Sequence, residues 1–160
     1  WVKDATGWWY RYEDGTYPAS ASVEINGATY RFDARGYMVT GWVSDDGRWF
    51  YYGDSGAQTM GWANLNGTWY YLEPPTGRMA TGWAVTSGTW YYLTPSGAMA
   101  IGWVQDGGSW YYLSYTGAMA TGWLNVGGSW YYLDASGAMV TGTRQVDGVT
   151  YTFGPDGRMQ

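Results

Sequence analysis

The dipeptide Gly-Trp recurs at a nearly constant interval through most of the chain. The steps between its occurrences are 20, 21, 20 and 20 residues, for tryptophans at Trp42, Trp62, Trp83, Trp103 and Trp123. Seven residues after each, a second tryptophan opens a run of three aromatic residues, beginning at Trp49, Trp69, Trp90, Trp110 and Trp130. A short fixed period is typical of repeat proteins, in which each repeat buries its apolar face against its neighbours. The chain is therefore expected to be a stack of small repeats.

A turn signal lies between the two tryptophans of every repeat. The residues are Asp46-Gly47, Asn66-Gly67, Ser87-Gly88, Gly107-Gly108 and Gly127-Gly128. These residues adopt positive φ at low cost, as two-residue hairpin turns require, and Trp and Tyr favour strands. Each repeat is predicted to be one β-hairpin followed by a connector with its own turn, such as Pro95-Ser96-Gly97. Because an isolated hairpin is marginally stable in water, the predicted fold is all-β, a solenoid of tandem β-hairpin repeats of about 20 residues.

The whole chain, residues 1–160, is predicted to form a single module with three parts. Residues 1–40 hold atypical repeats, residues 41–141 hold the regular ones, and residues 142–160 form a divergent terminal hairpin. Two repeats carry other residues at both tryptophan positions, namely Ser22 and Thr29 in one and Thr143 and Thr150 in the other. These two repeats are predicted to be structural.

The composition indicates the kind of core and excludes several kinds of catalytic site. There are 26 Gly, 13 Trp and 17 Tyr, so aromatic rings are expected to supply the core in place of aliphatic side chains. The chain has no cysteine and no histidine, which excludes disulfides, thiol nucleophiles and a histidine base. Its carboxylates, such as Asp45, Asp46 and Glu13, fall in or beside predicted turns, and no calcium-loop spacing occurs. We predict no catalysis, no metal site and no cofactor.

The net charge of −5 argues against a nucleic-acid partner but suits a polymer that carries cationic groups. No apolar run approaches the roughly 18 residues of a membrane span. The chain opens on Trp1 without a signal peptide and is interpreted as a piece of a larger protein.

Strand alternation predicts where the rings meet. Trp90 and Tyr92 share one face of a strand, while Tyr91 and Leu93 share the other, so each hairpin addresses two neighbours. Rings of adjacent repeats are then expected to converge with the Gly-Trp ring in the groove between them. Three converging π-faces suit a quaternary ammonium group. Core packing alone would also produce an aromatic ladder, but two Trp, two Tyr and a Met per repeat exceed what a thin stack needs, which favours binding.

One stretch displays the full repeat, from Gly82-Trp83 through Gly88-Thr89-Trp90-Tyr91-Tyr92-Leu93 to Gly97-Ala98-Met99-Ala100. It resembles the choline-binding repeats, also called cell-wall binding repeats, of bacterial surface proteins and autolysins, and the resemblance covers nearly the whole chain. It implies that choline lies between consecutive repeats, against two tryptophans of one repeat and the middle tyrosine of the next, with a methionine nearby. The implied sites are Trp62, Trp69, Met79 and Tyr91; Trp83, Trp90, Met99 and Tyr111; Trp103, Trp110, Met119 and Tyr131; and Trp123, Trp130, Met139 and Tyr151.

Two further sites follow less directly from the resemblance. Trp42, Trp49 and Tyr70 form a fifth candidate, in which Gln58 replaces the methionine and Met60 follows two residues later. The lowest-ranked candidate comprises Trp1, Trp8 and Tyr30, because the connector after it is irregular and Ser22 interrupts the next repeat.

The resemblance implies a non-catalytic, secreted module that anchors a larger protein to the bacterial cell wall. Its partner would be choline-bearing (lipo)teichoic acid or another cell-wall polymer, and the terminal hairpins could mediate a homodimer. Similar aromatic hairpin repeats occur in glucosyltransferases and large clostridial toxins, so a glucan-binding or other glycan-binding module is the first alternative. A structural or oligomerisation stalk without a ligand is the second. The Ala, Gly, Thr, Val and Met residues around the tryptophans favour a methyl cage over a sugar site.

Overall fold

The computed structural model describes all residues, 1–160, and its regular elements are exclusively β-strands. It divides into two compact units, Trp1–Ala80 and Thr81–Gln160. The first unit holds β1 (Val2–Lys3), β2 (Trp8–Trp9), β3 (Ala21–Ile25), β4 (Ala28–Phe32), β5 (Gly41–Asp45), β6 (Arg48–Tyr52), β7 (Gly61–Leu65), β8 (Thr68–Glu73) and β9 (Arg78–Met79). The second holds β10 (Gly82–Thr86), β11 (Thr89–Leu93), β12 (Gly102–Asp106), β13 (Ser109–Leu113), β14 (Gly122–Val126), β15 (Ser129–Leu133), β16 (Gly142–Val146) and β17 (Val149–Phe153). The predicted all-β fold of tandem hairpins is confirmed.

The hairpins share one register, which the turn residues set. In β12–β13, for example, Gly102 pairs with Leu113 and Asp106 pairs with Ser109, leaving Gly107-Gly108 as the two turn residues. Their φ angles are +55° and +84°, as a two-residue hairpin turn with both residues in the left-handed region requires. The non-glycine residues Asp46, Asn66 and Ser87 adopt φ between +50° and +53° at the equivalent position. The turns predicted from sequence are therefore present.

The connectors that follow β13 and β15 each return the chain to two hairpins at once. Met119 forms a β-bridge with Leu113 of its own repeat, and its backbone amide donates a 2.8 Å hydrogen bond to the carbonyl of Trp90 in the preceding repeat. The same bond joins Met139 to Trp110 at 2.7 Å. In the first unit, β9 extends this pairing, because it inserts between β6 and β8 to give a five-stranded sheet with the order β5-β6-β9-β8-β7. Consecutive repeats within a unit are thus joined by backbone hydrogen bonds as well as by ring contacts.

The buried core is more aliphatic than the composition suggests. The largest side chains with full burial are Phe32, Leu72, Leu93, Leu113 and Leu133, each of which pairs with the first residue of its hairpin. The second tryptophan of the regular hairpins stays 41 to 46% exposed. The expectation of a core built from aromatic rings is therefore wrong for four of these five positions, which carry leucine, although Phe32, Tyr52, Tyr131 and Phe153 are buried rings. The physical reason is strand alternation, because Leu93 lies three positions after Trp90 and therefore points to the opposite face of the strand, so the leucine can be buried while the tryptophan ring stays exposed.

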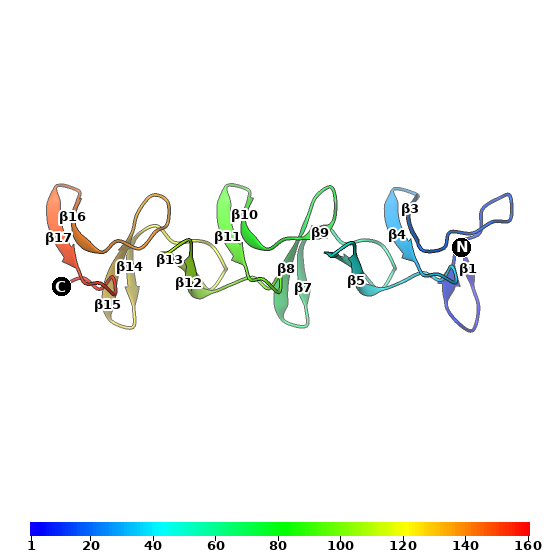
Figure 1. Ribbon diagram of the computed structural model, residues 1–160, viewed down its shortest axis with the longest axis horizontal. Helices are drawn as coiled ribbons and strands as arrows, with labels where there is room; N and C mark the ends of the chain where they lie inside the picture. The colour runs from blue at the N-terminus through cyan, green and yellow to red at the C-terminus, as the bar shows by residue number, and fades with distance from the viewer. The chain divides into compact units, whose positions relative to one another are not determined.

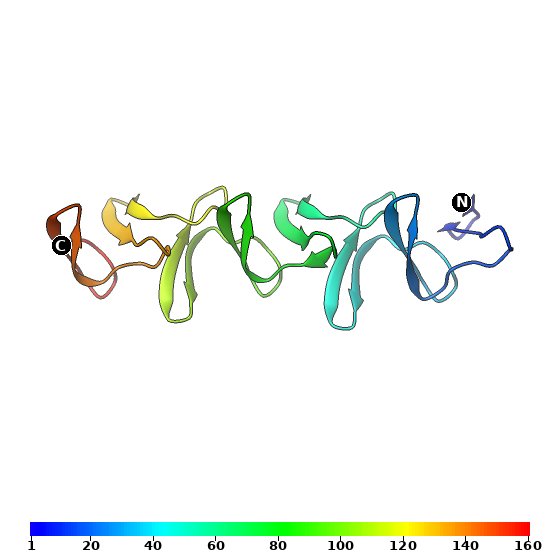
Figure 2. The same cartoon turned by 90° about the horizontal axis from the view of Figure 1, so that it is seen from above.

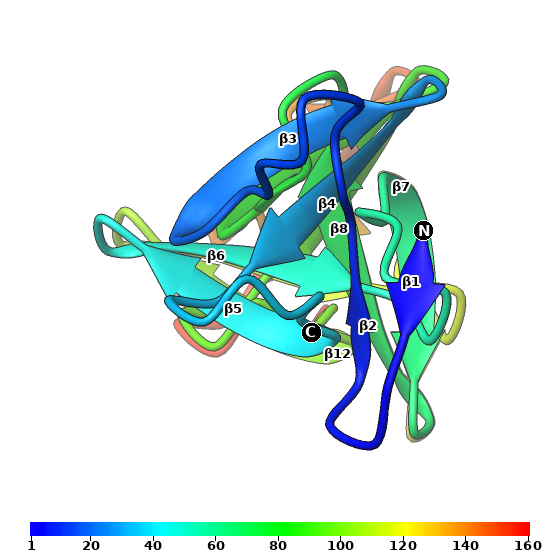
Figure 3. The same cartoon turned by 90° about the vertical axis from the view of Figure 1, so that its right-hand side faces the viewer.

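The direction of the hairpins changes from one repeat to the next within each unit. In the second unit, β10–β11 and β16–β17, which are three repeats apart, point the same way (Figure 1). The intervening hairpin β12–β13, yellow-green, points to a different side from the green β10–β11 (Figure 2). In the first unit, β3–β4, β5–β6 and β7–β8 point in different directions when viewed end-on (Figure 3). This rotation brings the connector of a third repeat close to the groove between two others.

Candidate ligand-binding cages

Three rings meet between the first two repeats of the second unit. Trp83 on β10 and Trp90 on β11 have centroids 6.3 Å apart and planes at 81°, because they lie on adjacent strands of one hairpin. Tyr111 of the next hairpin lies 4.8 Å from Trp83, at 70°. Together with Met119 these residues line an open pocket of about 380 Å³, the Trp83 cage. Such near-perpendicular walls present π-faces to a single group of cationic methyls.

The same arrangement recurs one repeat later. Trp103 lies 4.9 Å from Tyr131 of the next hairpin, at 62°, and Trp110 and Met139 complete the lining of a pocket of about 350 Å³. These four residues form the Trp103 cage. Tyr112, on the strand paired with that of Trp103, supports the Trp103 ring from 5.2 Å.

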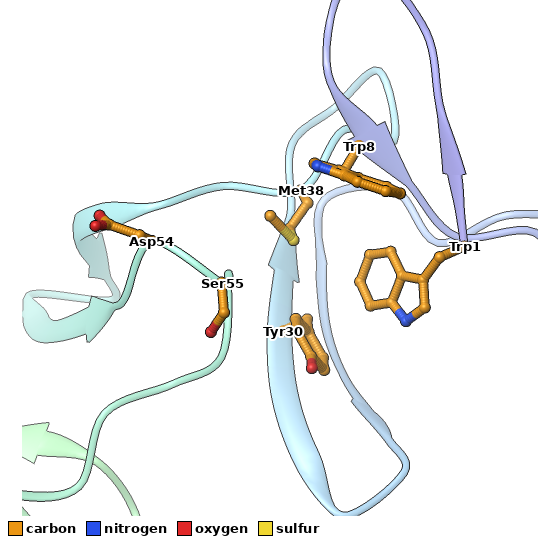
Figure 4. Close-up of a pocket in the computed structure, with 6 residues that line it drawn as sticks. All are labelled: Trp1, Trp8, Tyr30, Met38, Asp54 and Ser55. Carbon is orange, nitrogen blue, oxygen red and sulfur yellow. The ribbon is translucent and has the colours of Figure 1, made fainter.

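A third cage lies at the start of the chain, where the sequence favoured it least. Trp1, Trp8, Tyr30 and Met38 face a common space of about 380 Å³, with Asp54 and Ser55 across from the two tryptophans (Figure 4). The centroids of Trp1 and Tyr30 are 4.8 Å apart, the same spacing as between Trp83 and Tyr111. The long connector does not disturb this Trp1 cage, because Ser22 replaces a tryptophan of the following cage and not a wall of this one.

The methionine of each cage belongs to a different repeat from the one expected. Met119 lines the Trp83 cage, where Met99 was expected, and Met139 lines the Trp103 cage in place of Met119. The connector causes this shift, since it pairs each methionine with the tryptophan carbonyl of the preceding repeat. Tyrosine and methionine therefore come from the same repeat.

The same shift changes the interpretation of Gln58. Its backbone amide bonds to the carbonyl of Thr29 at 2.8 Å, and its Nε2 donates to the carbonyl of Thr76 at 3.0 Å. Gln58 thus lies beside the repeat that lacks tryptophans, and not beside Trp49. Met79 lies on strand β9, whose Arg78 pairs with Phe50, the residue after Trp49.

The remaining predicted residues fall into three groups. Trp42 lies 4.9 Å from Tyr70 and 6.4 Å from Trp49, all within the first unit. Trp123 lies 4.8 Å from Tyr151 and 6.3 Å from Trp130, and Met159, not Met139, bonds to the Trp130 carbonyl. The site predicted from Trp62, Trp69, Met79 and Tyr91 draws residues from both units and stays a prediction.

One of the two repeats without tryptophans has a role other than the structural one that was predicted. It supplies Tyr30 and Met38 to the Trp1 cage and so contributes two of the walls. Its own tryptophan position carries Ser22, whose hydroxyl accepts from Arg31 at 3.3 Å and lies 3.3 Å from the Tyr52 hydroxyl. Arg31 also pairs with Asp45 at 3.2 Å. A polar network thus replaces the aromatic cage at this one interface.

Each cage has a third contributor that the sequence did not reveal. The connector two repeats onward adds Ala135 and Ser136 to the Trp83 cage, and Pro155, Asp156 and Arg158 to the Trp103 cage. Gly137, with φ +83°, packs against Met119 so closely that a Cβ there would lie 2.7 Å from the methionine Cε. Only the rotation of the hairpins brings these segments together, so no local pattern indicates them.

A carboxylate orders the connector that reaches the Trp83 cage. Asp134 Oδ1 accepts hydrogen bonds from the Ser136 hydroxyl at 2.6 Å, the Ser136 amide at 2.8 Å and the Ala138 amide at 3.2 Å. The Ser136 hydroxyl contributes most to holding the pKa of Asp134 below its usual value, and the two amides add to it. This carboxylate therefore acts as a turn cap.

A second carboxylate, Asp106, holds a ring of the cage itself. Its Oδ2 accepts a 3.1 Å hydrogen bond from the indole Nε1 of Trp83, one repeat earlier.

Asp106→Leu is expected to weaken ligand binding in the Trp83 cage about threefold, because the indole loses a charge-assisted hydrogen bond at a partly exposed site. Asp106→Asn keeps an acceptor and should restore most of the affinity. The measurement is the ligand dependence of the Trp83 indole NMR resonance, and equal affinities for both variants and the unaltered chain would contradict this role.

The structure also limits other kinds of site. No group of three or more His, Cys, Asp and Glu side chains is placed to hold a metal ion. No helix is present that is long and apolar enough to cross a membrane.

Fold and cages together define a class, a hairpin-repeat protein with aromatic cages between its repeats. The sequence profile of the choline-binding repeat matches residues 20–60, 59–102 and 100–143. The chain therefore belongs to the choline-binding repeat family, as the sequence resemblance predicted. Repeat domains of this family are non-catalytic modules of bacterial surface proteins.

Solved structures agree with this assignment. CbpJ from Streptococcus pneumoniae is 40% identical over the whole chain, with a TM-score of 0.91. Choline binding protein F from the same species, solved in the presence of a peptidoglycan analogue, is 37% identical over the whole chain, with a TM-score of 0.90. The chain spans 57% of each of these two structures. Alternansucrase in complex with isomaltononaose is 25% identical over 91% of the chain, which spans 12% of that protein, with a TM-score of 0.51. No match was found among the curated proteins.

Proposed function

We propose that this chain is a non-catalytic module that attaches a larger, secreted protein to the bacterial cell wall by caging choline groups of (lipo)teichoic acid between its repeats. The observation that carries the proposal is the near-perpendicular set of two tryptophans and one tyrosine in the Trp83 cage, with centroids 4.8 and 6.3 Å apart. A quaternary ammonium group has no N–H to donate, so it is recognised by π-faces and methyl contacts and needs no hydrogen-bond acceptor.

Repetition would supply the strength of attachment. Each ring adds only about 0.5 to 2 kcal/mol, so a single cage would bind choline weakly. Several cages engaging one polymer would convert later contacts into intramolecular ones, and the gain would depend on effective concentration. The net charge of −5 would favour the approach of cationic groups. A homodimer through the terminal hairpins stays a prediction.

Glucan binding is the second candidate, supported by the similarity to alternansucrase. A neutral sugar offers hydroxyl groups, which need polar partners beside the stacking ring. The Trp83 cage supplies few polar partners. Its lining has two hydroxyl groups, those of Ser136 and Tyr111, and its other residues are Trp83, Trp90, Met119 and Ala135. This lining favours methyl groups over hydroxyl groups.

A titration of choline chloride into the whole chain tests the proposal. We expect saturable changes in tryptophan fluorescence and a rise of the thermal midpoint, since each occupied cage adds about 2.7 kcal/mol to the folded state at a choline concentration of 100 Kd. Sodium chloride at equal ionic strength should have no such effect, and Trp83→Ala combined with Trp103→Ala should diminish the response.

The rival functions give different outcomes in the same experiment. Stabilisation of the chain by an isomaltooligosaccharide but not by choline would support a glycan-binding module. No response to either ligand would leave a structural stalk, which sedimentation analysis would then test for self-association.

A further inference from the structure

The methionine of each cage contacts both the open pocket and the connector of the next repeat. Met38, Met119 and Met139 line the three cages, and each is only partly buried. The sulfur of each is also the atom nearest to the space that a Cβ would take on a glycine of the next connector. The pairs are Met38–Gly56, Met119–Gly137 and Met139–Gly157, and Met99–Gly117 has the same contact.

This contact leaves no room for a further atom. A Cβ at Gly137 would lie 2.7 Å from the Met119 Cε and closer still to the sulfur, which is shorter than van der Waals contact. Gly137 lies two residues before Met139, whose amide donates a 2.7 Å hydrogen bond to the carbonyl of Trp110. The Met119 sulfur therefore packs on the connector that carries the methionine of the next cage.

At one interface the methionine position carries a polar residue, which shows what a polar group needs there. The Gln58 side chain contacts Gly77 as the methionines contact their glycines. Its Nε2 donates a 3.0 Å hydrogen bond to the carbonyl of Thr76, the residue before that glycine. A methionine sulfoxide has an oxygen that accepts hydrogen bonds but no N–H, so it cannot form this bond. A sulfoxide at Met119 would thus be polar without the compensation that Gln58 has.

We propose that Met119 and Met139 are oxidation-sensitive residues, at which sulfoxidation by hydrogen peroxide loosens the next connector and weakens ligand binding in the cage. The sulfur lone pair attacks one peroxide oxygen, the O–O bond breaks, an S–O bond forms, and the second oxygen leaves as water with both protons. The sulfur loses two electrons, and the peroxide gains them. A flexible apolar side chain becomes a polar one at a tightly packed contact. The effect on ligand affinity rests on the proposed function, whereas the effect on the connector does not.

Two variants of the whole chain isolate one methionine. Met139→Leu leaves the Met119 sulfur in place, and Met119→Leu combined with Met139→Leu removes both sulfurs while keeping apolar side chains of similar volume. Met60 is 44% exposed and lines none of the three cages, so its oxidation in both chains serves as an internal control. Mass spectrometry of chymotryptic peptides gives the oxidised fraction at each methionine after mild peroxide treatment.

Hydrogen exchange measures the connector without any ligand. After oxidation, the backbone amide at position 139 should exchange about threefold faster or more in the single variant, because its bond to the Trp110 carbonyl opens more often. The double variant should show no change. Methionine sulfoxide reductases should restore the original exchange rate, which distinguishes this effect from oxidation of tryptophan.

The choline affinity of the Trp83 cage is measured on the same samples from the Trp83 indole resonance. Oxidation should lower it about two- to tenfold in the single variant, the range that thioether contacts with rings allow, and leave it unchanged in the double variant. Unchanged exchange or unchanged affinity with Met119 fully oxidised would overturn the inference, as would an equal loss in the double variant. A Trp83 resonance that does not respond to choline before oxidation would instead defeat the proposed function, while the exchange rates would still test the connector contact.

Discussion

Leu113→Ala is expected to lower the free energy of unfolding of the second unit by about 3 kcal/mol. Leu113 is fully buried, and its backbone forms the β-bridge to Met119 that joins connector and hairpin. Truncating such a side chain removes its transfer free energy and leaves a cavity, and the measured range for buried leucines is about 2 to 5 kcal/mol. Urea unfolding without ligand, followed by far-UV circular dichroism, measures the change.

Val85→Ala serves as the control for this prediction. Val85 lies in the same unit but is 51% exposed, so its replacement should change stability by no more than about 0.5 kcal/mol. If Leu113→Ala and Val85→Ala lose equal amounts, the leucine row is not the core of the unit.

Trp110→Ala is expected to lower the choline affinity of the Trp103 cage about tenfold while leaving most of the stability of the second unit intact. A ring wall contributes about 1 to 2 kcal/mol to a caged cation, which corresponds to a factor of about 5 to 30 in Kd. Trp110 is 41% exposed in the structure, so its side chain adds less to the core than to the pocket. The affinity is read from the choline dependence of the Trp103 indole resonance.

Trp130→Ala is the matched control, because Trp130 belongs with Trp123 in the next groove. Trp130→Ala should leave the choline response of the Trp103 indole unchanged and diminish that of the Trp123 indole. Trp110→Ala should diminish the response of Trp103 and leave that of Trp123 unchanged. Unchanged choline affinity at Trp103 in the Trp110→Ala chain would sink the assignment of Trp110 as a cage wall.

The positions of the missed residues explain the limits of sequence reasoning here. The sequence ranks the Trp1 cage last because the connector that follows its first hairpin is irregular. That connector supplies none of the walls, which include Tyr30 and Met38 of the next repeat. The methionines were assigned one repeat too early, because spacing along the chain does not reveal which neighbour a connector joins. Composition alone does not indicate the core leucines, because the chain has 13 Trp and 17 Tyr beside them and counts of residues do not show which face of a strand is buried.

The sequence by itself determined the hairpin, its turns and its faces, because these depend on residues within about ten positions of one another: glycines and asparagines at positive φ, and aromatic residues alternating across a strand. The resemblance to the choline-binding repeats also implied the ring pairs that the structure has between adjacent repeats within each unit, such as Trp83 with Tyr111 and Trp103 with Tyr131. Tertiary structure alone decided that Met119 and Ser136 join the Trp83 cage and that Arg158 joins the Trp103 cage. The reason is geometric, since the rotation between hairpins carries the third repeat back beside the first two, and that rotation depends on packing along the whole unit.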